Sequence, residues 1–393
     1  MKKKLLFVTT ALWVGGIESA LVNLLGELAA DYDLTVALLR NDRALAPELP
    51  NGCRLLVAER DTWLTRLTEP PTAPSRLHRA LDWGFSALRW VEEGRHVRQL
   101  ARLTGRDYHR ILIFSQNAAG VGLRAFPKEK PILFYHQGSA PDRVKNWNRC
   151  GKIVAVSEPL AEEMRSKFPE LSEKVVAIPN ILTGERVLRR GSEFDPGFPA
   201  DTFNIVTVGR LHHDKGPDLA VEAAAILRDR GLNFRWYLVG NGPEEAHLGE
   251  KIQEYGLETA VILTGLRENP YPYMKNADLY VQPSRVEGWG LAISEARILG
   301  RPVIATDTLG ARAQLPPERL CAVRADALAE KILESEFSSE SWDWQEENRK
   351  NLAKLRKILK KRGAYGNRNR HRSGVQHCPL PGGMCGVHPS PEP

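Results

Sequence analysis

Cysteine is scarce in this chain of 393 residues: there are five cysteines, odd in number and scattered along the sequence. This usage is typical of proteins from a reducing compartment and does not predict a disulfide framework. No stretch approaches the roughly 18 consecutive apolar residues that a membrane-spanning helix requires. The sequence therefore predicts a cytoplasmic protein and disfavours the disulfide-rich secreted class and the integral membrane class.

A cleavable signal peptide is also disfavoured, although the first residues superficially resemble one. Three lysines at 2–4 precede the apolar run Leu5–Val8. The run breaks at Thr9-Thr10, and the following Gly15-Gly16 with Glu18 makes a poor cleavage region. We therefore interpret residues 4–9 as a first buried strand.

The basic character of the chain is confined to one segment. The net charge is +7, and 11 Lys and Arg residues without any acidic residue lie between Arg349 and Arg372, so the rest of the chain carries about −4. Proteins that bind nucleic acid usually carry their positive charge on the body of the domain. We therefore expect no nucleic-acid partner.

Short apolar runs alternate with segments of helical spacing in two series. The first series of runs covers 4–9, 33–40, 54–57, 111–114, 131–135, 153–156 and 175–178. The second covers 203–208, 234–239, 260–263, 277–283, 302–305 and 320–323. Helical spacing occurs at 17–29, 217–228, 244–255 and from 291 onward. This alternation predicts two α/β units of the Rossmann-like type, each with a parallel sheet covered by helices. Tandem units of this kind create a cleft, which is a common site for small ligands.

Chain breakers separate the two series and define the expected boundaries. Gly191–Pro199 is rich in glycine, proline and acidic residues, which predicts a linker over 191–201. The first unit is expected at 1–190 and the second at 202–340.

Residues 60–110 differ from the rest in composition. They contain ten arginines and no lysine, six acidic residues, and interleaved aromatic side chains such as Trp63, Trp83 and Trp90. One interpretation is a face that binds a membrane surface or an acceptor. The other is an ordinary helical insert whose arginines are solvated.

The C-terminal region also admits two interpretations. Residues 341–362 are expected to include an amphipathic helix, because Leu352, Leu355 and Leu359 lie on one side of a basic segment, 349–361. This helix either packs back across the two units or attaches the protein to the inner membrane face as a peripheral protein. Residues 363–393 are rich in Gly, Pro, Arg and His, and we expect them to be disordered.

The stretch Arg285–Ala296 carries the strongest local signal for a ligand site. Glu287 and Glu295 stand eight residues apart, with Gly288 and Gly290 between them and an apolar helical face starting at Leu291. A strand, a glycine turn and a helix leave free backbone N–H groups at the helix start, where a phosphate can bind. Taken alone, the pair is equally explained by a turn with two solvated glutamates.

Other loops carry basic or glycine residues at the ends of expected strands. Gly209-Arg210 and Lys215 share the loop before the helix at 217, where a planar guanidinium and a point charge suit a diphosphate. Gly240-Asn241-Gly242 is a glycine turn after the next strand, but it lacks the G-x-G-x-x-G spacing of a dinucleotide site. His136 follows the run 131–135, at the sheet edge where such folds bind ligands.

Five motifs occur together and in order. They are Gly15-Gly16-x-Glu18, Gly209-Arg210-Leu211 with Lys215-Gly216, Val239-Gly240-x-Gly242-Pro243, Glu287-Gly288-x-Gly290-Leu291, and Glu295-Ala296. In this order and spacing the chain resembles the retaining glycosyltransferases of the GT-B fold, family GT4, typified by bacterial polysaccharide and glycolipid transferases. The resemblance covers about residues 1–335.

The resemblance implies a role for each matching position. The unit at 1–190 would face the acceptor and the unit at 202–340 would bind the nucleotide sugar, UDP- or GDP-linked. Arg210 and Lys215 would bind the donor diphosphate, Glu287 and His136 would contact the donor sugar near the reacting centre, and Glu295 would hold the ribose hydroxyls. The remaining donor-binding positions implied are Gly15, Gly16, Gly209, Gly240, Gly242, Gly288, Gly290 and Leu291.

The implied activity is a hexosyltransferase that moves a sugar to a saccharide or lipid-linked acceptor with retention of anomeric configuration. The resemblance further implies that a phosphate oxygen of the leaving group takes the acceptor proton, and that neither a metal nor a cofactor is needed. One departure is visible, because the segment after Gly310 is shorter than in the family. Two alternatives stay open: a catalytically impaired relative that only binds nucleotide sugars, and a GT-B epimerase or phosphorylase.

Overall fold

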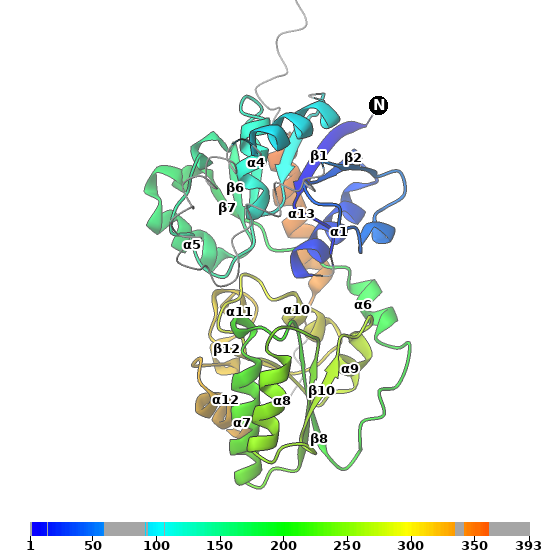
Figure 1. Ribbon diagram of the computed structural model, residues 1–393, viewed down its shortest axis with the longest axis vertical. Helices are drawn as coiled ribbons and strands as arrows, with labels where there is room; N and C mark the ends of the chain where they lie inside the picture. Colours follow the sequence, from blue (N-terminus) through cyan, green and yellow to red (C-terminus); the bar gives the residue numbers. More distant parts are fainter. Residues whose placement is uncertain are drawn as a thin grey trace, which may run out of the picture.

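The computed structural model describes residues 2–13, 15–58, 91, 93–105, 107–334 and 342–360. Within these residues the chain forms two parallel sheets, one in each half of the sequence (Figure 1). The first has the strand order β3-β2-β1-β4-β5-β6-β7 and the second β10-β9-β8-β11-β12-β13. The fold class expected from the alternating runs, two Rossmann-like α/β units, is confirmed.

The strands of the first sheet are β1 (Lys3–Thr9), β2 (Tyr32–Leu38), β3 (Arg54–Val57), β4 (Arg110–Ile113), β5 (Ile132–Tyr135), β6 (Lys152–Ala155) and β7 (Val175–Ala177). Those of the second are β8 (Phe203–Val208), β9 (Phe234–Val239), β10 (Val261–Gly265), β11 (Leu279–Gln282), β12 (Val303–Thr306) and β13 (Leu320–Cys321). The helices used below are α1 (Gly16–Leu28), α5 (Glu158–Lys167), α6 (Gly184–Arg190), α7 (Pro217–Asp229), α8 (Glu245–Glu254), α9 (Tyr271–Asn276), α10 (Leu291–Ile298), α11 (Leu309–Arg312), α12 (Ala325–Glu334) and α13 (Trp344–Lys360).

Burial of both faces explains why the central strands appear in the sequence as continuous apolar runs. In β1, Leu5, Leu6, Phe7 and Val8 are all fully buried. Leu6 and Val8 belong to the hydrophobic cluster on one face of the sheet, and Leu5 and Phe7 to the cluster on the other. Helices on both faces of a parallel sheet produce this pattern. The second sheet likewise separates two clusters.

Helix α6 packs with the second unit, although the composition boundary at 190 groups it with the first. Its Val187, with Leu182 just before it, lies in a cluster with side chains of α9, α10 and the second sheet. Ile178 and Ile181 still pack with the first sheet. Chain breakers reveal where the backbone is irregular, whereas packing depends on which apolar face is covered, so the two divisions differ.

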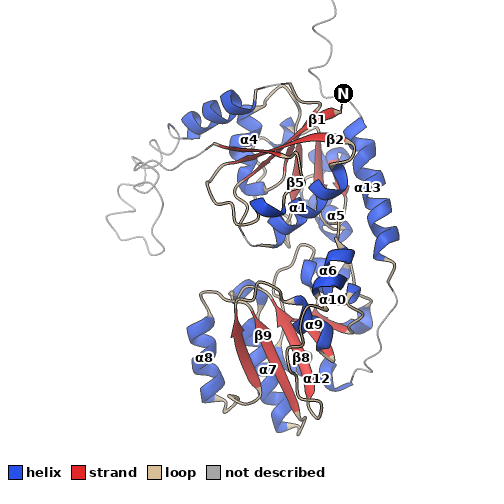
Figure 2. Ribbon diagram, turned by 90° about the vertical axis from the view of Figure 1, so that its right-hand side faces the viewer, coloured by secondary structure: helices blue, strands red, loops and turns tan. Residues whose placement is uncertain are grey.

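The C-terminal helix α13 spans both units, lying along the first one in the views of Figures 1 and 2. At its start, Trp344 packs against the cluster that holds α6, and the amide of Asn348 exchanges two hydrogen bonds with the backbone of Leu182. Toward its end, Leu352, Leu355 and Leu359 are buried in the first unit. The apolar side of this helix is therefore used inside the protein, in agreement with the interpretation that it packs back across the units.

Two of the predicted regions cannot be compared with the structure. Residues 60–110 fall largely outside the described residues, as do all of 363–393. The membrane, acceptor and disorder interpretations of these segments stay predictions. Among the residues that are described, no helix is long and apolar enough to cross a membrane.

Candidate active site

Two loops of the second unit bring Lys215 and Glu287 together. One loop runs from β8 to α7, and the other from β11 to α10. Because β8 and β11 are neighbours in the sheet, their C-terminal loops lie side by side. The Lys215 Nζ atom is 2.7 Å from Glu287 Oε2, and their side chains are 26% and 12% exposed. The two residue types expected at a diphosphate and a sugar hydroxyl therefore form an ion pair.

A chain of buried polar side chains supports Glu287 from within the unit. The Tyr280 hydroxyl donates to Gln282 Oε1 at 2.6 Å, and Gln282 Nε2 donates to Ser284 Oγ at 2.8 Å. Ser284 Oγ in turn lies 3.4 Å from Glu287 Oε2. Buried polar groups need partners, so this chain restricts the orientations open to the Glu287 carboxylate.

Helix α10 begins at the glycine turn that follows Glu287. Gly290 adopts a left-handed conformation (φ +81°), which glycine tolerates best. Ile293 N donates to Gly290 O at 3.0 Å, so the N–H groups of Leu291 and Ala292 precede the first bond of the helix. Unpaired N–H groups and the helix dipole favour an anion at this end.

A second buried network holds this turn in place. Trp289 Nε1 donates to Ser294 Oγ at 3.0 Å, and Ser294 Oγ donates to Gln314 Oε1 at 2.5 Å. The Gln314 amide donates back to the carbonyls of Trp289 and Gly290. All three side chains are buried. The first residues of α10 are thus tied to the segment after α11.

The two units touch directly beside Glu287. A Cβ atom on Gly138 would lie 2.5 Å from the backbone nitrogen of Glu287, and one on Gly288 would lie 2.6 Å from the carbonyl oxygen of Gln137 and still closer to that of His136. Trp289 is buried in the cluster of the first unit. The loop after β5 and the loop after β11 therefore meet without room for side chains, which places His136 next to the glycine turn.

His136 has one ring nitrogen, Nε2, that is buried and without a hydrogen-bond partner among the described residues. Burial lowers the pKa of the imidazole to about 4, against a smaller effect of a hydrogen bond to the Phe114 backbone. The ring is therefore neutral near pH 7. A neutral imidazole with a free nitrogen can exchange a hydrogen bond with a hydroxyl group of a ligand.

The first unit contributes Gly15 and Gly16 at the start of α1, together with the buried Glu18. A Cβ atom on Gly15 would lie 2.7 Å from Glu18 Oε2, so glycine leaves room for this carboxylate. A Cβ atom on Gly16 would lie 4.0 Å from Leu291, across the interface. Burial raises the pKa of Glu18, while hydrogen bonds and the positive charge of Arg210 act to lower it. Arg210 itself is exposed, which leaves its guanidinium free to meet an anion in the cleft.

The glycines at 240 and 242 have a structural reason of their own. A Cβ atom at Gly240 would collide with the carbonyl of Gly209, and one at Gly242 with the carbonyl of Leu211. Leu211 N donates to Asn241 O at 2.8 Å. The two turns are thus packed backbone against backbone, which positions the loop that carries Arg210. Gly209 itself has open space beside its Cα.

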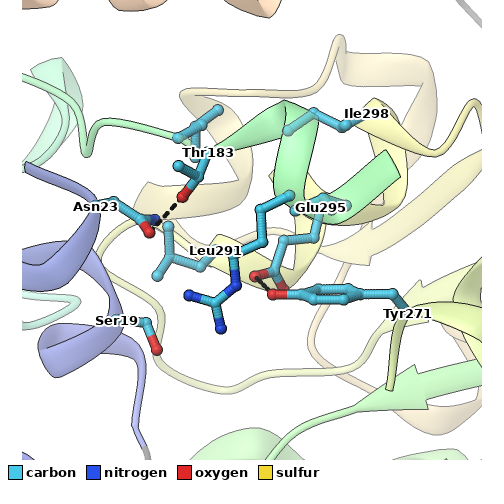
Figure 3. Close-up of a pocket in the computed structure, with 10 residues that line it drawn as sticks. Ser19, Asn23, Thr183, Tyr271, Leu291, Glu295 and Ile298 are labelled. Atoms are coloured by element: carbon cyan, nitrogen blue, oxygen red, sulfur yellow. Dashed lines mark hydrogen bonds between the residues drawn. The ribbon is translucent and has the colours of Figure 1, made fainter. Parts of the chain in front are cut away.

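Glu295 lines a small pocket between α1, α6, α9 and α10 rather than the Lys215–Glu287 pair (Figure 3). The Tyr271 hydroxyl donates to Glu295 Oε1 at 3.0 Å. Burial raises the pKa of this carboxylate, although the Tyr271 hydrogen bond and the Arg186 charge lower it. The Arg186 guanidinium also pairs with Glu48 of the first unit, with contacts of 2.5 and 3.0 Å. Leu291 lines the same pocket and contacts the space beside Gly16, so the two parts of the site adjoin.

Several residues of this site carry no signal that reasoning from the sequence could use. Arg186, Tyr271 and Gln314 lie outside the five motifs, and each reaches the site through tertiary packing. Glu18 belongs to the first motif, but the resemblance implies no role for this carboxylate.

The segment after Gly310 is structured. Helix α11 follows β12 directly and contacts α5 of the first unit, and β13 pairs with β12 over two residues. In the part of the chain that the structure describes, no group of three or more His, Cys, Asp or Glu side chains could hold a metal ion. Metal independence stays a prediction.

Comparison with known families gives one match in the second half of the chain. Residues 189–354 match the family described as glycosyl transferases group 1. An uncharacterised glycosyltransferase of Methanocaldococcus jannaschii is 27% identical over 215 residues, which cover 53% of this chain and 53% of that protein. The 2-deoxystreptamine glucosyltransferase of Streptomyces kanamyceticus is 28% identical over 41% of this chain and 44% of that protein. The chain thus matches about half the length of these relatives.

The solved structures with this fold cover most of the chain. HepE of Anabaena in complex with UDP and glucose superposes with a TM-score of 0.63 at 19% identity, covering 92% of this chain and 95% of that one. TarM of S. aureus, in a mutant complex with UDP, superposes with a TM-score of 0.64 at 12% identity, covering 92% and 97%. At this identity the likeness is one of fold.

Proposed function

We infer that this chain, whose residues 189–354 belong to the group 1 glycosyltransferases and whose two units form a GT-B fold, transfers a sugar from a nucleoside diphosphate to an acceptor hydroxyl. The acceptor we propose is a saccharide or a lipid-linked saccharide. The Lys215–Glu287 pair, 2.7 Å apart at the start of α10, is the observation that carries the proposal.

The donor diphosphate would lie between the Lys215–Arg210 loop and the start of α10. A lysine ammonium has three N–H donors, and Glu287 engages it with one oxygen, so the other two can meet phosphate oxygens. Arg210 is exposed on the same loop. Together with the N–H groups of Leu291 and Ala292, these donors would stabilise the charge that develops on the departing nucleoside diphosphate.

The sugar would sit toward the first unit, between Glu287 and His136. In the proposed transfer, the bond from the anomeric carbon to the phosphate oxygen breaks, and the acceptor oxygen bonds to the same face of that carbon. The acceptor proton passes to a phosphate oxygen of the leaving group. The protein then needs no base of its own. The neutral His136 and the Glu287 side chain would orient the sugar through its hydroxyls.

The nucleoside would extend toward Glu295. Solved complexes of HepE and TarM contain UDP, which supports a uridine or another nucleoside diphosphate as the ligand class here. Glu295 would accept hydrogen bonds from ribose hydroxyls. These hydroxyls would replace the Tyr271 hydroxyl, which donates to Glu295 in this structure. We also propose a cytoplasmic location, peripheral attachment to the membrane and metal-independent transfer.

Transfer assays with a panel of nucleotide sugars test the proposed function. Each donor is first screened by thermal shift, because a ligand at 100 times its Kd raises stability by about 2.7 kcal/mol. The donors that bind are then assayed with oligosaccharide and lipid-linked acceptors, and the anomeric configuration of the product is read by NMR. Retention supports the proposal, and inversion contradicts its mechanism. Binding without turnover would instead identify a nucleotide-sugar-binding relative, and product formed without an acceptor would indicate an epimerase.

A further inference from the structure

A second set of contacts joins the loops of Lys215 and Glu287. The backbone N–H groups of Arg285 and Val286 both donate to the carbonyl of Asp214, at 2.8 and 3.1 Å. Gly216 adopts a left-handed conformation (φ +61°), and a Cβ atom there would collide with the Pro283 carbonyl. The two loops are therefore in direct backbone contact on both sides of the Lys215–Glu287 pair.

The Arg285 side chain reinforces this contact through a bidentate ion pair with Asp218, here called the fork. Its Nη1 and Nη2 atoms each donate to one oxygen of Asp218, both at 2.7 Å, and Nη1 also donates to the carbonyl of His213 at 3.0 Å. The two side chains are 23% and 18% exposed. A guanidinium that binds both oxygens of a carboxylate fixes orientation as well as distance.

Each group of the fork shifts the pKa of the other so that its charged form is favoured. Burial acts to raise the pKa of Asp218, but Arg285 and nearby backbone N–H groups outweigh it, so the pKa is lowered. The pKa of Arg285 is raised, chiefly by its hydrogen bonds to Asp218. Both groups are thus ionised near pH 7, and the fork persists over the pH range of ordinary assays.

The fork joins two points of the chain that lie close in sequence to Glu287 and to Lys215. Arg285 lies two residues before Glu287, and Asp218 lies three residues after Lys215. Asp218 belongs to the first turn of α7, a helix packed into the core of the second unit. A restraint between these two points limits how far Lys215 and Glu287 can move relative to each other.

We propose that Arg285 is a positioning residue of the transfer site. Through its paired hydrogen bonds to Asp218, it fixes the positions of Lys215 and Glu287 relative to each other. The proposal rests on the proposed function for its catalytic consequence, but the positioning itself can be measured without any substrate. The Arg285 guanidinium donates to Asp218 and to the His213 carbonyl, and not to the side chain of Lys215 or Glu287, so it acts through the loops.

The positioning is tested by the chemical reactivity of Lys215. Wild-type protein, Arg285→Ala and Arg285→Lys are treated with a limiting amount of N-hydroxysuccinimidyl acetate, and acetylation of Lys215 is followed by peptide mass spectrometry. Arg285→Ala is expected to speed acetylation of Lys215 several-fold, because the ion pair with Glu287 loosens. Arg285→Lys, which keeps the charge but not the fork, should fall between the two.

Arg324→Ala is the matched control. Arg324 makes a similar fork with Asp326, both contacts at 3.0 Å, on the exposed surface before α12. It should leave the acetylation rate of Lys215 unchanged. Thermal melting of every variant shows whether it is folded, and Arg285→Lys carries the test should Arg285→Ala fail to fold.

The catalytic consequence is measured with the donor identified by the panel. We expect kcat for Arg285→Ala to fall about 10- to 100-fold, as for a small misplacement of catalytic groups, with partial recovery in Arg285→Lys and little change in the KM of the acceptor. Faster acetylation without a fall in kcat would overturn the catalytic part of the inference. Unchanged acetylation in both variants would overturn the positioning itself. Absence of turnover in the wild-type protein would refute the proposed function, and the acetylation result would still decide the inference.

Discussion

Lys215 and Glu287 are the side chains on which the proposed transfer depends most directly. Their ion pair fixes the Lys215 ammonium beside the Glu287 carboxylate, three residues after which Gly290 precedes the start of α10. The same pairing distinguishes the two glutamates of residues 287–295, the EGWGLAISE stretch. Glu287 belongs with the lysine, whereas Glu295 belongs with Tyr271 in a separate part of the site.

Lys215→Met and Glu287→Gln should each lower kcat/KM about 10²- to 10³-fold, the range found when one donor to a developing negative charge is removed. Because the two side chains act together, the double variant should be little worse than either single one. Steady-state kinetics of all three variants provides the measurement. Lys251→Met is the control, since Lys251 pairs with Glu222 at 2.5 Å on helices α7 and α8. Full activity in Lys215→Met would refute the site assignment.

The burial of the Glu18 carboxylate predicts a specific pH dependence of the free energy of unfolding. Burial raises its pKa above the ordinary value of 4.5, so the folded protein holds this proton more tightly than the unfolded chain. The free energy of unfolding therefore decreases as pH rises from the unfolded value through the raised folded value, and the loss is complete above it. Glu18→Gln does not titrate and should gain stability relative to wild type as the pH rises over the interval above 4.5.

Urea unfolding across that interval measures the difference. The exposed Glu27→Gln on the same helix is the control, and its curve should run parallel to that of wild type. A parallel curve for Glu18→Gln as well would show that the Glu18 carboxylate does not carry the expected burial penalty.

At the scale of elements, the position of α10 depends on a network from outside its own motif. Gln314 follows α11, yet its amide donates to the carbonyls of Trp289 and Gly290 at the start of α10. The segment after Gly310 thus supports the glycine turn through the Gln314 side chain.

Gln314→Leu should lower the free energy of unfolding by about 1–3 kcal/mol, because it removes the side-chain donor to the buried Trp289 carbonyl and the acceptor of the Ser294 hydroxyl proton. If the turn binds the distal phosphate, the same variant should also raise the KM of the donor. Chemical denaturation and donor kinetics are the two measurements. Gln253→Leu, at an exposed position on α8, makes the same side-chain change and should have little effect on either. A stable variant with a normal donor KM would show that the network is dispensable.

At the scale of the whole molecule, the two units meet through backbone beside Glu287 and through side chains elsewhere. Gly138 and Gly288 approach the opposite unit so closely that neither has room for a methyl group. The buried Trp289 and the contact between α11 and α5 extend the same interface. Close contacts between the two units therefore border the proposed site.

Gly138→Ala should shift the units toward an open arrangement, because its Cβ would overlap the Glu287 backbone. We expect a larger radius of gyration in small-angle X-ray scattering and a loss of transfer activity, with each unit still folded. Gly249→Ala is the control, since nothing lies within 4 Å of its Cβ position, and an alanine within helix α8 should stabilise it by about 0.5–1 kcal/mol. An unchanged scattering profile for Gly138→Ala would mean that the interface can accommodate the methyl group.

The sequence by itself determined the fold class, the order of the strands along the chain and the loops that carry Lys215 and Glu287. These features follow from local physics. Apolar runs that are buried on both faces must be central strands, and glycine or basic residues after such runs must lie at the carboxyl edge of a parallel sheet. For the same reason the start of α10 at Leu291 could be placed from the Glu287 to Ala296 stretch alone.

Tertiary structure alone decided which of these residues meet. The pairing of Lys215 with Glu287, the separation of Glu295 into a pocket with Arg186, and the support of α10 by Gln314 join positions between about twenty and a hundred residues apart. Such contacts depend on strand order in the sheet and on the closure of one unit over the other. Neither leaves a periodic signal in a single chain, because any exposed polar residue of the right type would look the same in the sequence. The EGWGLAISE stretch was thus visible from the start, but its two glutamates could be assigned to different parts of the site only once their neighbours were known.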